Sequence, residues 1–221
     1  MKITAFEYGK TILWEDWIFR GGDHEKTYPI SLLFFLIETE NKKILVDVGC
    51  DEMHGFPLSE HESPVRLLER HGIMRGEITN VLLTHTHGDH ADCVGYYPNA
   101  TVCVHESERA EAEKRLCGNA RLLTFSDSLE LTDRIRMVHI GGHSVGSSVV
   151  EIKTPEKTIL MCGDECYHKS IFDSPDRLAR SACRESSLAF FRKYSSPEYA
   201  PIVFHDPEIV GSHGAKVIYE E

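Results

Sequence analysis

Short apolar runs separated by polar turns dominate the pattern along this chain. Three runs near its start, residues 2–8, 30–39 and 42–49, are rich in the β-branched and aromatic residues that favour strands. The polar residues 40–43 lie between the last two runs and predict a hairpin. The pattern therefore predicts a sheet at the beginning of the fold.

Later runs predict further strands with helices between them. We expect strands over residues 78–83, 100–106, 122–125, 135–140, 148–154, 157–164 and 201–206. We expect helices over residues 63–73, 106–116 and 184–194, the first of which has Pro64 at its start. Sheets covered by outer helices, occurring twice, favour an α/β protein with the layer order αββα. We expect one domain over residues 1–221.

The polar segment 84–90, with the sequence THTHGDH, directly follows an apolar run. It places His85, His87, Asp89 and His90 at one strand end. In a loop that leaves a strand, two histidines spaced two apart can turn both rings toward one point. Such groups are costly to hold together away from water unless a positive charge lies among them. The spacing therefore predicts a metal site rather than a solvated polar loop.

Later strand ends carry three more residues of metal-ligating type. His143 follows Gly141 and Gly142, which allow the backbone a close approach, while Asp164 and His205 each end an apolar run. Each of the three alone would more often be a satisfied core or turn residue. Together, after the THTHGDH segment, they extend the prediction to a site for two metal ions.

The charge and cysteine content narrow the class of partner. The chain has 24 Lys and Arg against 35 Asp and Glu, a formal net charge of -11, so its average surface repels nucleic acids and anionic membranes. The start lacks the layout of a secretory signal, and the apolar run 32–37 is too short to cross a bilayer. Seven cysteines, an odd number, fit reduced thiols. We expect a cytoplasmic protein that acts on a small molecule, and the oligomeric state stays open.

The THTHGDH segment resembles the HxHxDH loop of the metallo-β-lactamase fold superfamily. The later single histidine, bridging aspartate and final histidine of that family match His143, Asp164 and His205 in order. The match extends over nearly the whole chain. The resemblance implies a four-layer αββα sandwich of the metallo-β-lactamase type.

The resemblance also implies a ligand assignment. One ion would be held by His85, His87 and His143, the second by Asp89, His90 and His205, and Asp164 would bridge the two. Asp47 resembles a family aspartate that supports the ligand histidines from behind. Nitrogen and oxygen ligands suit zinc, and they also suit manganese or iron.

Within the family, His90 and Asp164 point away from the true β-lactamases, and the resemblance leans toward the acyl-homoserine lactonases. Tyr167, three residues after Asp164, is similar in position to a tyrosine that lactonases of this fold place over the substrate carbonyl. The alternative is an ordinary half-buried aromatic residue.

An aromatic segment follows the first strand and contains Trp14, Trp17 and Phe19 with two glycines. The resemblance implies a place beside the cleft, because this region often borders it in the fold. Substrate contact and core packing are both open for these three side chains.

The ligand set implies a hydrolase. Two cations that share one water would lower its pKa to about 7 or below, so we expect a metal-bridging hydroxide to attack a lactone or related ester. Tyr167 would hold the oxyanion and Asp89 would carry the proton. The alternatives are a mononuclear iron oxidoreductase similar to persulfide dioxygenases, and a thioesterase or phosphodiesterase of the same fold.

Overall fold

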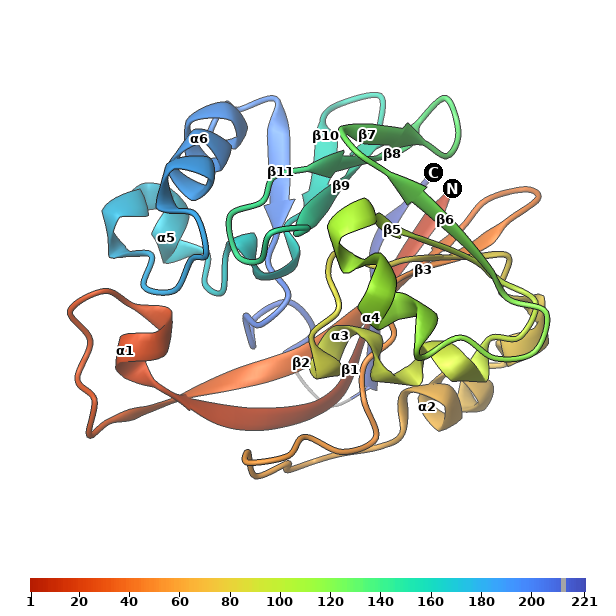
Figure 1. Ribbon diagram of the computed structural model, residues 1–221, viewed down its shortest axis with the longest axis horizontal. Helices are drawn as coiled ribbons and strands as arrows, with labels where there is room; N and C mark the ends of the chain where they lie inside the picture. Colours follow the sequence, from red (N-terminus) through yellow and green to blue (C-terminus); the bar gives the residue numbers. More distant parts are fainter. Residues whose placement is uncertain (212–213) are drawn as a thin grey trace.

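Two β-sheets packed face to face make up the centre of the fold. The computed structural model describes residues 1–211 and 214–221, and Figure 1 shows the path of the chain. Over these residues the larger sheet has seven strands in the spatial order β12, β1, β2, β3, β4, β5, β6. Their bounds are β1 Lys2–Trp14, β2 Thr27–Glu38, β3 Lys43–Val46, β4 Asn80–Leu82, β5 Thr101–His105, β6 Arg121–Phe125 and β12 Gly214–Glu220.

The smaller sheet and the helices complete the layers. In the same described ranges this sheet has five strands in the order β11 (Tyr199–Ile202), β10 (Thr158–Met161), β9 (Ser148–Lys153), β8 (Ile135–His139) and β7 (Ser128–Glu130). The α-helices are α1 Glu15–Ile18, α2 Pro64–Arg70, α3 Gly88–Ala91, α4 Arg109–Glu113, α5 Ser170–Asp173 and α6 Arg184–Tyr194. Helices α2 to α4 lie beside the larger sheet, and α5 and α6 beside the smaller one (Figure 1). The predicted αββα order is confirmed.

Alternating side chains along β2 connect these layers. Phe35 belongs to the core between the two sheets, together with Val150 of β9. Its neighbour Phe34 points to the opposite side and belongs to the cluster that contains Leu67 of α2. Successive residues of a strand face opposite sides, so an unbroken apolar run such as residues 32–37 is typical of a strand buried on both faces.

Several elements differ from the sequence expectation. The apolar pattern does not predict β7 or β12, because both are partly exposed and β7 has only three residues. β1 continues to Trp14 because it pairs with β2 along its whole length as an antiparallel ribbon. The helix expected over 106–116 is a 3₁₀ turn at Glu106–Glu108 followed by the short α4. The last predicted strand ends at Ile202, so His205 lies in the turn that follows.

The carboxyl ends of strands from both sheets meet at one edge. In the larger sheet β3, β4 and β5 are parallel neighbours, and in the smaller sheet β10 and β11 are parallel. The segments after β3, β4, β10 and β11 carry Asp47, residues 84–90, Asp164 and His205. Parallel neighbours end at the same edge of a sheet, which brings these side chains near one another.

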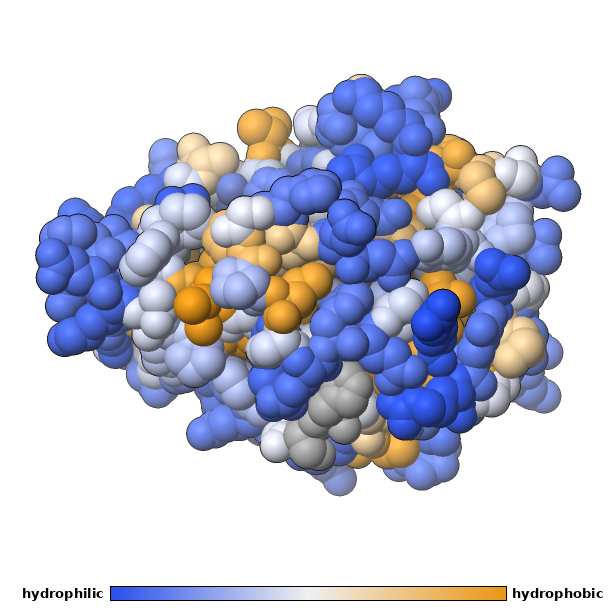
Figure 2. Space-filling view, turned by 90° about the horizontal axis from the view of Figure 1, so that it is seen from below, coloured by the Kyte–Doolittle hydropathy of each residue, from blue (hydrophilic) through white to orange (hydrophobic). Residues whose placement is uncertain are grey.

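Polar residues cover most of the face shown in Figure 2; the largest group of apolar side chains lies left of its centre, and smaller groups are scattered over the rest. Ile12 and Trp14, near the end of β1, are 43% and 44% exposed.

None of the helices in the described part of the chain has the length and apolar character needed to cross a bilayer.

Candidate metal centre

The predicted site residues come together where the strand ends meet. Residues 84–90 leave β4 and enter α3, His143 lies between β8 and β9, and Asp164 lies in a 3₁₀ turn after β10. Gly163 has a φ of 52°, and a side chain there would approach Thr84 to 2.8 Å. Glycine at this position therefore lets the end of β10 lie against the end of β4.

Four side chains form the first cluster: His85, His87, His143 and Asp164. His143 Nε2 lies 3.0 Å from His87 Nδ1 and 3.3 Å from Asp164 Oδ2. His85 Nε2 lies 3.8 Å from the same carboxylate oxygen. Ligands bound about 2 Å from one zinc ion lie roughly 3 to 4 Å from each other, so this spacing suits a single cation.

Asp89, His90 and His205 form the second cluster. Asp89 Oδ2 lies 3.5 Å from His90 Nε2 and 3.7 Å from His205 Nε2. Asp164 Oδ1 lies 3.0 Å from His90 Nε2 and 2.9 Å from His205 Nε2, while its Oδ2 faces the first cluster. Asp164 is therefore placed between the clusters, with one oxygen toward each.

Hydrogen bonds on the far side of the imidazole rings fix their orientation. His90 Nδ1 lies 2.7 Å from Asp47 Oδ2, and His205 Nδ1 lies 2.9 Å from the backbone oxygen of Ser31. An accepting oxygen requires Nδ1 to carry a proton, so a ring that is neutral has the lone pair of Nε2 toward the cluster. Asp47 is itself held by the backbone N–H and the hydroxyl of Thr84, each at 2.8 Å.

The ligand atoms fit divalent metal ions. His85 is completely buried, and its Nε2 has no hydrogen-bond partner among the described residues. A buried nitrogen without a partner is costly, and a cation placed among the lone pairs removes that cost. Imidazole and carboxylate groups together are ligands of zinc, manganese and iron. Each cluster can therefore hold a divalent ion, and the individual ligand assignments stay predictions.

The two clusters differ in their protonation. Burial lowers the pKa of His85 and lowers that of His143 to about 4, so both rings are neutral at neutral pH. Burial acts in the same direction on His90 and His205, but the Asp164 carboxylate opposes it and the pKa of both rings is raised. For Asp164, burial favours the neutral acid, and the His90 and His205 rings outweigh it, so its pKa is well below the usual range. Asp164 is therefore ionised.

A cavity of about 310 Å³ opens over the two clusters. Leu13, Trp17, Ile30, Met53 and Phe56 form its apolar wall. Residues of both clusters line it together with Tyr167 and Arg180. A small molecule with an apolar part and a polar reacting group fits such a lining.

The segment after the first strand has three aromatic residues, and of these Trp17 lines the cavity. Trp14 is largely exposed to solvent. Phe19 is buried, with its ring 5.4 Å from that of Tyr28 in an edge contact. Trp17 can therefore contact a substrate, whereas Phe19 packs against other side chains.

Tyr167 and Asp89, the two predicted catalytic side chains, both line the cavity. The Tyr167 hydroxyl donates to Asp164 Oδ2 at 2.8 Å, and its ring stacks on His205 with centroids 5.0 Å apart. The backbone carbonyl of Asp89 accepts a hydrogen bond from the Tyr8 hydroxyl at 2.8 Å. This bond fixes the Asp89 backbone, while the Asp89 carboxylate forms part of the second cluster.

Comparison with known families identifies the fold family. The family described as the Metallo-beta-lactamase superfamily matches residues 33–204, well over half of the 221 residues. The chain belongs to the metallo-beta-lactamase superfamily.

Among the relatives in this superfamily is the N-acyl homoserine lactonase of Bacillus cereus, which is 26% identical over 212 residues covering 84% of each chain. A structure of N-acyl homoserine lactone hydrolase, with N-hexanoyl-L-homoserine bound at the catalytic metal center, matches with a TM-score of 0.82, 20% identity and 94% of both chains covered. AidC, a dizinc quorum-quenching lactonase, matches with a TM-score of 0.73, 16% identity and coverage of 99% of this chain and 94% of its own. The two structures share the metallo-beta-lactamase fold with this chain.

The metallo-beta-lactamase site has a buried support that the sequence pattern does not reveal. Glu165 accepts hydrogen bonds from the backbone N–H groups of Gly142 at 3.1 Å and His143 at 3.0 Å, and from the Ser147 hydroxyl. A side chain on Gly142 would collide with this carboxylate. Glu165 therefore fixes the loop that carries His143. Its one signal in the sequence is its position next to Asp164.

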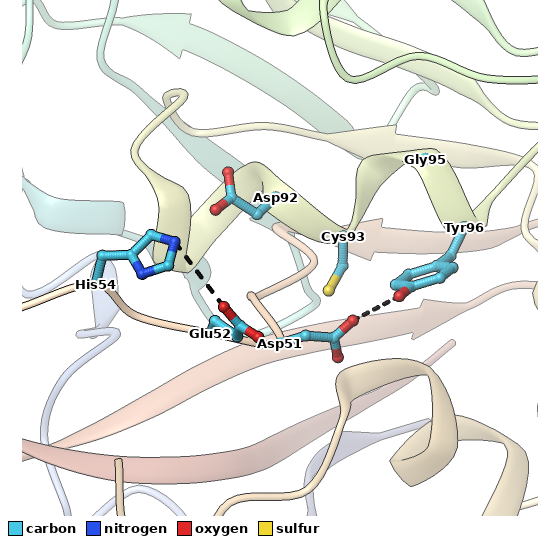
Figure 3. A pocket seen from close by; sticks show the side chains of 7 residues that line it. All are labelled: Asp51, Glu52, His54, Asp92, Cys93, Gly95 and Tyr96. Atoms are coloured by element: carbon cyan, nitrogen blue, oxygen red, sulfur yellow. Dashed lines mark hydrogen bonds and ion pairs between the residues drawn. The ribbon is translucent and has the colours of Figure 1, made fainter. Parts of the chain in front are cut away.

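A second cavity, of about 370 Å³, lies outside the metallo-beta-lactamase site (Figure 3). It is lined by Asp51, Glu52, His54, Asp92, Cys93, Gly95 and Tyr96, and Figure 3 shows Tyr96 bonded to Asp51 and His54 near Glu52. Burial raises the pKa of the Cys93 thiol, which opposes a nucleophilic role. No residue of the two clusters lines this cavity, so its greater size does not make it the reaction site.

Proposed function

We propose that this chain is a dinuclear metal-dependent hydrolase that opens a lactone or cleaves a related ester. The observation that carries the proposal is the position of Asp164, with one oxygen toward each of two histidine-containing clusters on the floor of a cavity. The similarity to N-acyl homoserine lactonases over most of the chain supports a lactone as substrate.

In this proposal each cluster holds one ion. His85, His87 and His143 would hold the first, Asp89, His90 and His205 would hold the second, and Asp164 would contribute one oxygen to each. Zinc is the proposed metal, because its preference for imidazole nitrogen and carboxylate oxygen matches these ligands. Manganese and iron accept the same ligands, so metal analysis has to decide.

The bound ions would supply Lewis acidity at the scissile carbonyl and lower the pKa of the water that attacks it. The chain's own groups then orient the substrate and handle protons. The Tyr167 hydroxyl lines the cavity and donates its one proton to Asp164 Oδ2, and it would turn from this carboxylate to donate to the substrate oxygen that becomes negative. The Asp89 carboxylate, which belongs to the second cluster, would take a proton from the attacking water and pass it to the leaving oxygen.

The apolar wall supports an acyl substituent on the substrate. Trp17 and Phe56 meet edge to face with centroids 5.8 Å apart, and Met53 and Ile30 add flexible and branched surface. A chain of methylene groups loses water against such a wall, which favours binding by about 0.8 kcal/mol for each buried methylene. A small-molecule substrate and a cytoplasmic location complete the proposal.

Metal analysis followed by a substrate panel tests the proposal. The purified chain should contain about two divalent ions, lose activity after chelation, regain it with zinc, and cleave lactones in preference to thioesters, phosphodiesters and persulfides. One iron per chain with oxygen uptake on persulfides would overturn it in favour of an oxidoreductase. Preferred cleavage of thioesters or phosphodiesters would overturn the lactone assignment.

A further inference from the structure

Arg180 places a positive charge on the wall of the cavity. Its guanidinium carbon lies 3.4 Å from the centroid of the Trp17 ring, and both residues line the cavity that contains Asp164 and Tyr167. A guanidinium stacked on an aromatic face keeps its N–H groups at the edge of the plane. The stacked position therefore leaves hydrogen-bond donors for a partner in the cavity.

Among the described residues, no carboxylate lies within salt-bridge distance of Arg180. The neighbouring Arg184, in contrast, is 3.5 Å from Asp176 and donates to the backbone oxygen of Leu178. Other arginines in the described part of the chain also lack a carboxylate partner, and Arg180 differs from them because its exposed side chain lines the cavity. A guanidinium has five donors and no acceptor, and it stays charged at any working pH.

We propose that Arg180 determines specificity by receiving a carboxylate at the far end of the substrate's acyl chain. This inference rests on the proposed function, because it names the kind of lactone or ester that the site takes. The reacting carbonyl would lie over the two clusters, the methylene groups along Leu13, Ile30 and Met53, and the terminal carboxylate against the guanidinium. The geometry points to a lactone or ester whose acyl chain ends in an anion.

Arg177 provides a matched control for a merely structural role. Its guanidinium carbon lies 4.6 Å from the centroid of the Phe19 ring, so it makes the same kind of contact from the same segment. Arg177 is not among the described residues that line the cavity. If the arginines only hold this segment against the aromatic residues, then replacing either one has the same consequence.

The test compares three lactones whose acyl chains have equal length and end in a carboxylate, a carboxamide or a methyl group. Arg180→Met keeps the apolar stem over Trp17 and removes the charge. We expect this variant to lose about ten- to a hundredfold in kcat/KM on the carboxylate substrate, since a charge-assisted hydrogen bond is lost, with little change on the other two. Arg177→Met should keep the preference of the unsubstituted chain.

Binding gives a second readout that does not depend on turnover. With the zinc-loaded protein, dicarboxylates from succinate to suberate are compared by calorimetry with monocarboxylates of equal length. At least one dicarboxylate should bind about tenfold or more tightly than its monocarboxylate partner, and Arg180→Met should remove the difference. Equal binding of every pair would overturn the inference.

The outcomes separate the two proposals. If the zinc-loaded chain cleaves no lactone or ester, the proposed function fails, whatever the dicarboxylates show. If it cleaves the methyl-ended and the carboxylate-ended lactone with equal kcat/KM, the function stands and the role of Arg180 is overturned. An equal loss on all three lactones in Arg180→Met also overturns it, because that pattern belongs to a structural contact.

Discussion

Asp47 Oδ2 lies 2.7 Å from His90 Nδ1, and both side chains are buried. The carboxylate fixes the tautomer that turns the His90 Nε2 lone pair toward the second cluster. We expect Asp47→Ala to weaken metal binding by about ten- to a hundredfold, measured by competition with a chelator. Asp51→Ala, which removes a carboxylate of the second cavity, should leave the affinity unchanged.

His87 is an exposed candidate ligand, so its side chain can be removed without disturbing the core. Because its ring is exposed, His87→Ala should leave no cavity in the core, and the protein should stay folded by circular dichroism. We expect the variant to lose the ion of the first cluster and most activity, measured as metal per chain. His54→Ala, which removes a ring that is 94% exposed, should keep both ions. Full metal content in His87→Ala would contradict the assignment.

Tyr167→Phe removes one hydroxyl and keeps the ring that stacks on His205. If the hydroxyl stabilises the oxyanion, kcat on a lactone should fall by about ten- to a thousandfold while the metal content stays at two ions. Steady-state kinetics together with metal analysis separates this role from a loss of ligands. An unchanged rate would remove Tyr167 from the reaction.

Metal loading should depend on pH more strongly at the second cluster than at the first. Without metal, the pKa of His90 and His205 is raised, because Asp164 outweighs the effect of burial, so each ring holds a proton that a cation must displace. Burial lowers the pKa of His85 and His143, so these two rings of the first cluster hold no such proton at neutral pH. Affinity at the second cluster should therefore fall as pH falls from about 8 to about 6.

Zinc titration at several pH values within that range checks this order of release. The ion of the second cluster should leave first, and the bound stoichiometry should pass through about one ion per chain. Loss of both ions in a single step, or retention of the second cluster's ion alone, would contradict the assigned protonation.

The carboxylate of Glu165 should stabilise the His143 loop. Glu165→Ala leaves the backbone N–H groups of Gly142 and His143 without their acceptor, at a cost of about 1 to 3 kcal/mol for each buried donor. We expect a lower free energy of unfolding and weaker metal binding at the first cluster, measured by denaturant unfolding and chelator competition. Glu165→Gln keeps an acceptor oxygen and should recover most of the loss.

The layer order of the fold could be predicted from the sequence because apolar runs such as residues 32–37 specify strands buried on both faces. The edge strand β12 could not, because exposed residues carry no apolar period and its pairing with β1 is set by the opposite end of the chain. The length of β1 could not be predicted either, because its last residues are held in the strand by pairing with β2 and not by their own apolar pattern.

The sequence by itself determined the residue types and the family of the site, because the spacing of His85, His87, Asp89 and His90 within one segment is a local property. Only the tertiary structure decided that Glu165 lies under the His143 loop and that Arg180 stacks on Trp17 beside the cavity. These contacts join segments far apart in the chain. Chain spacing carries no record of them, because they arise when sheets and loops pack together.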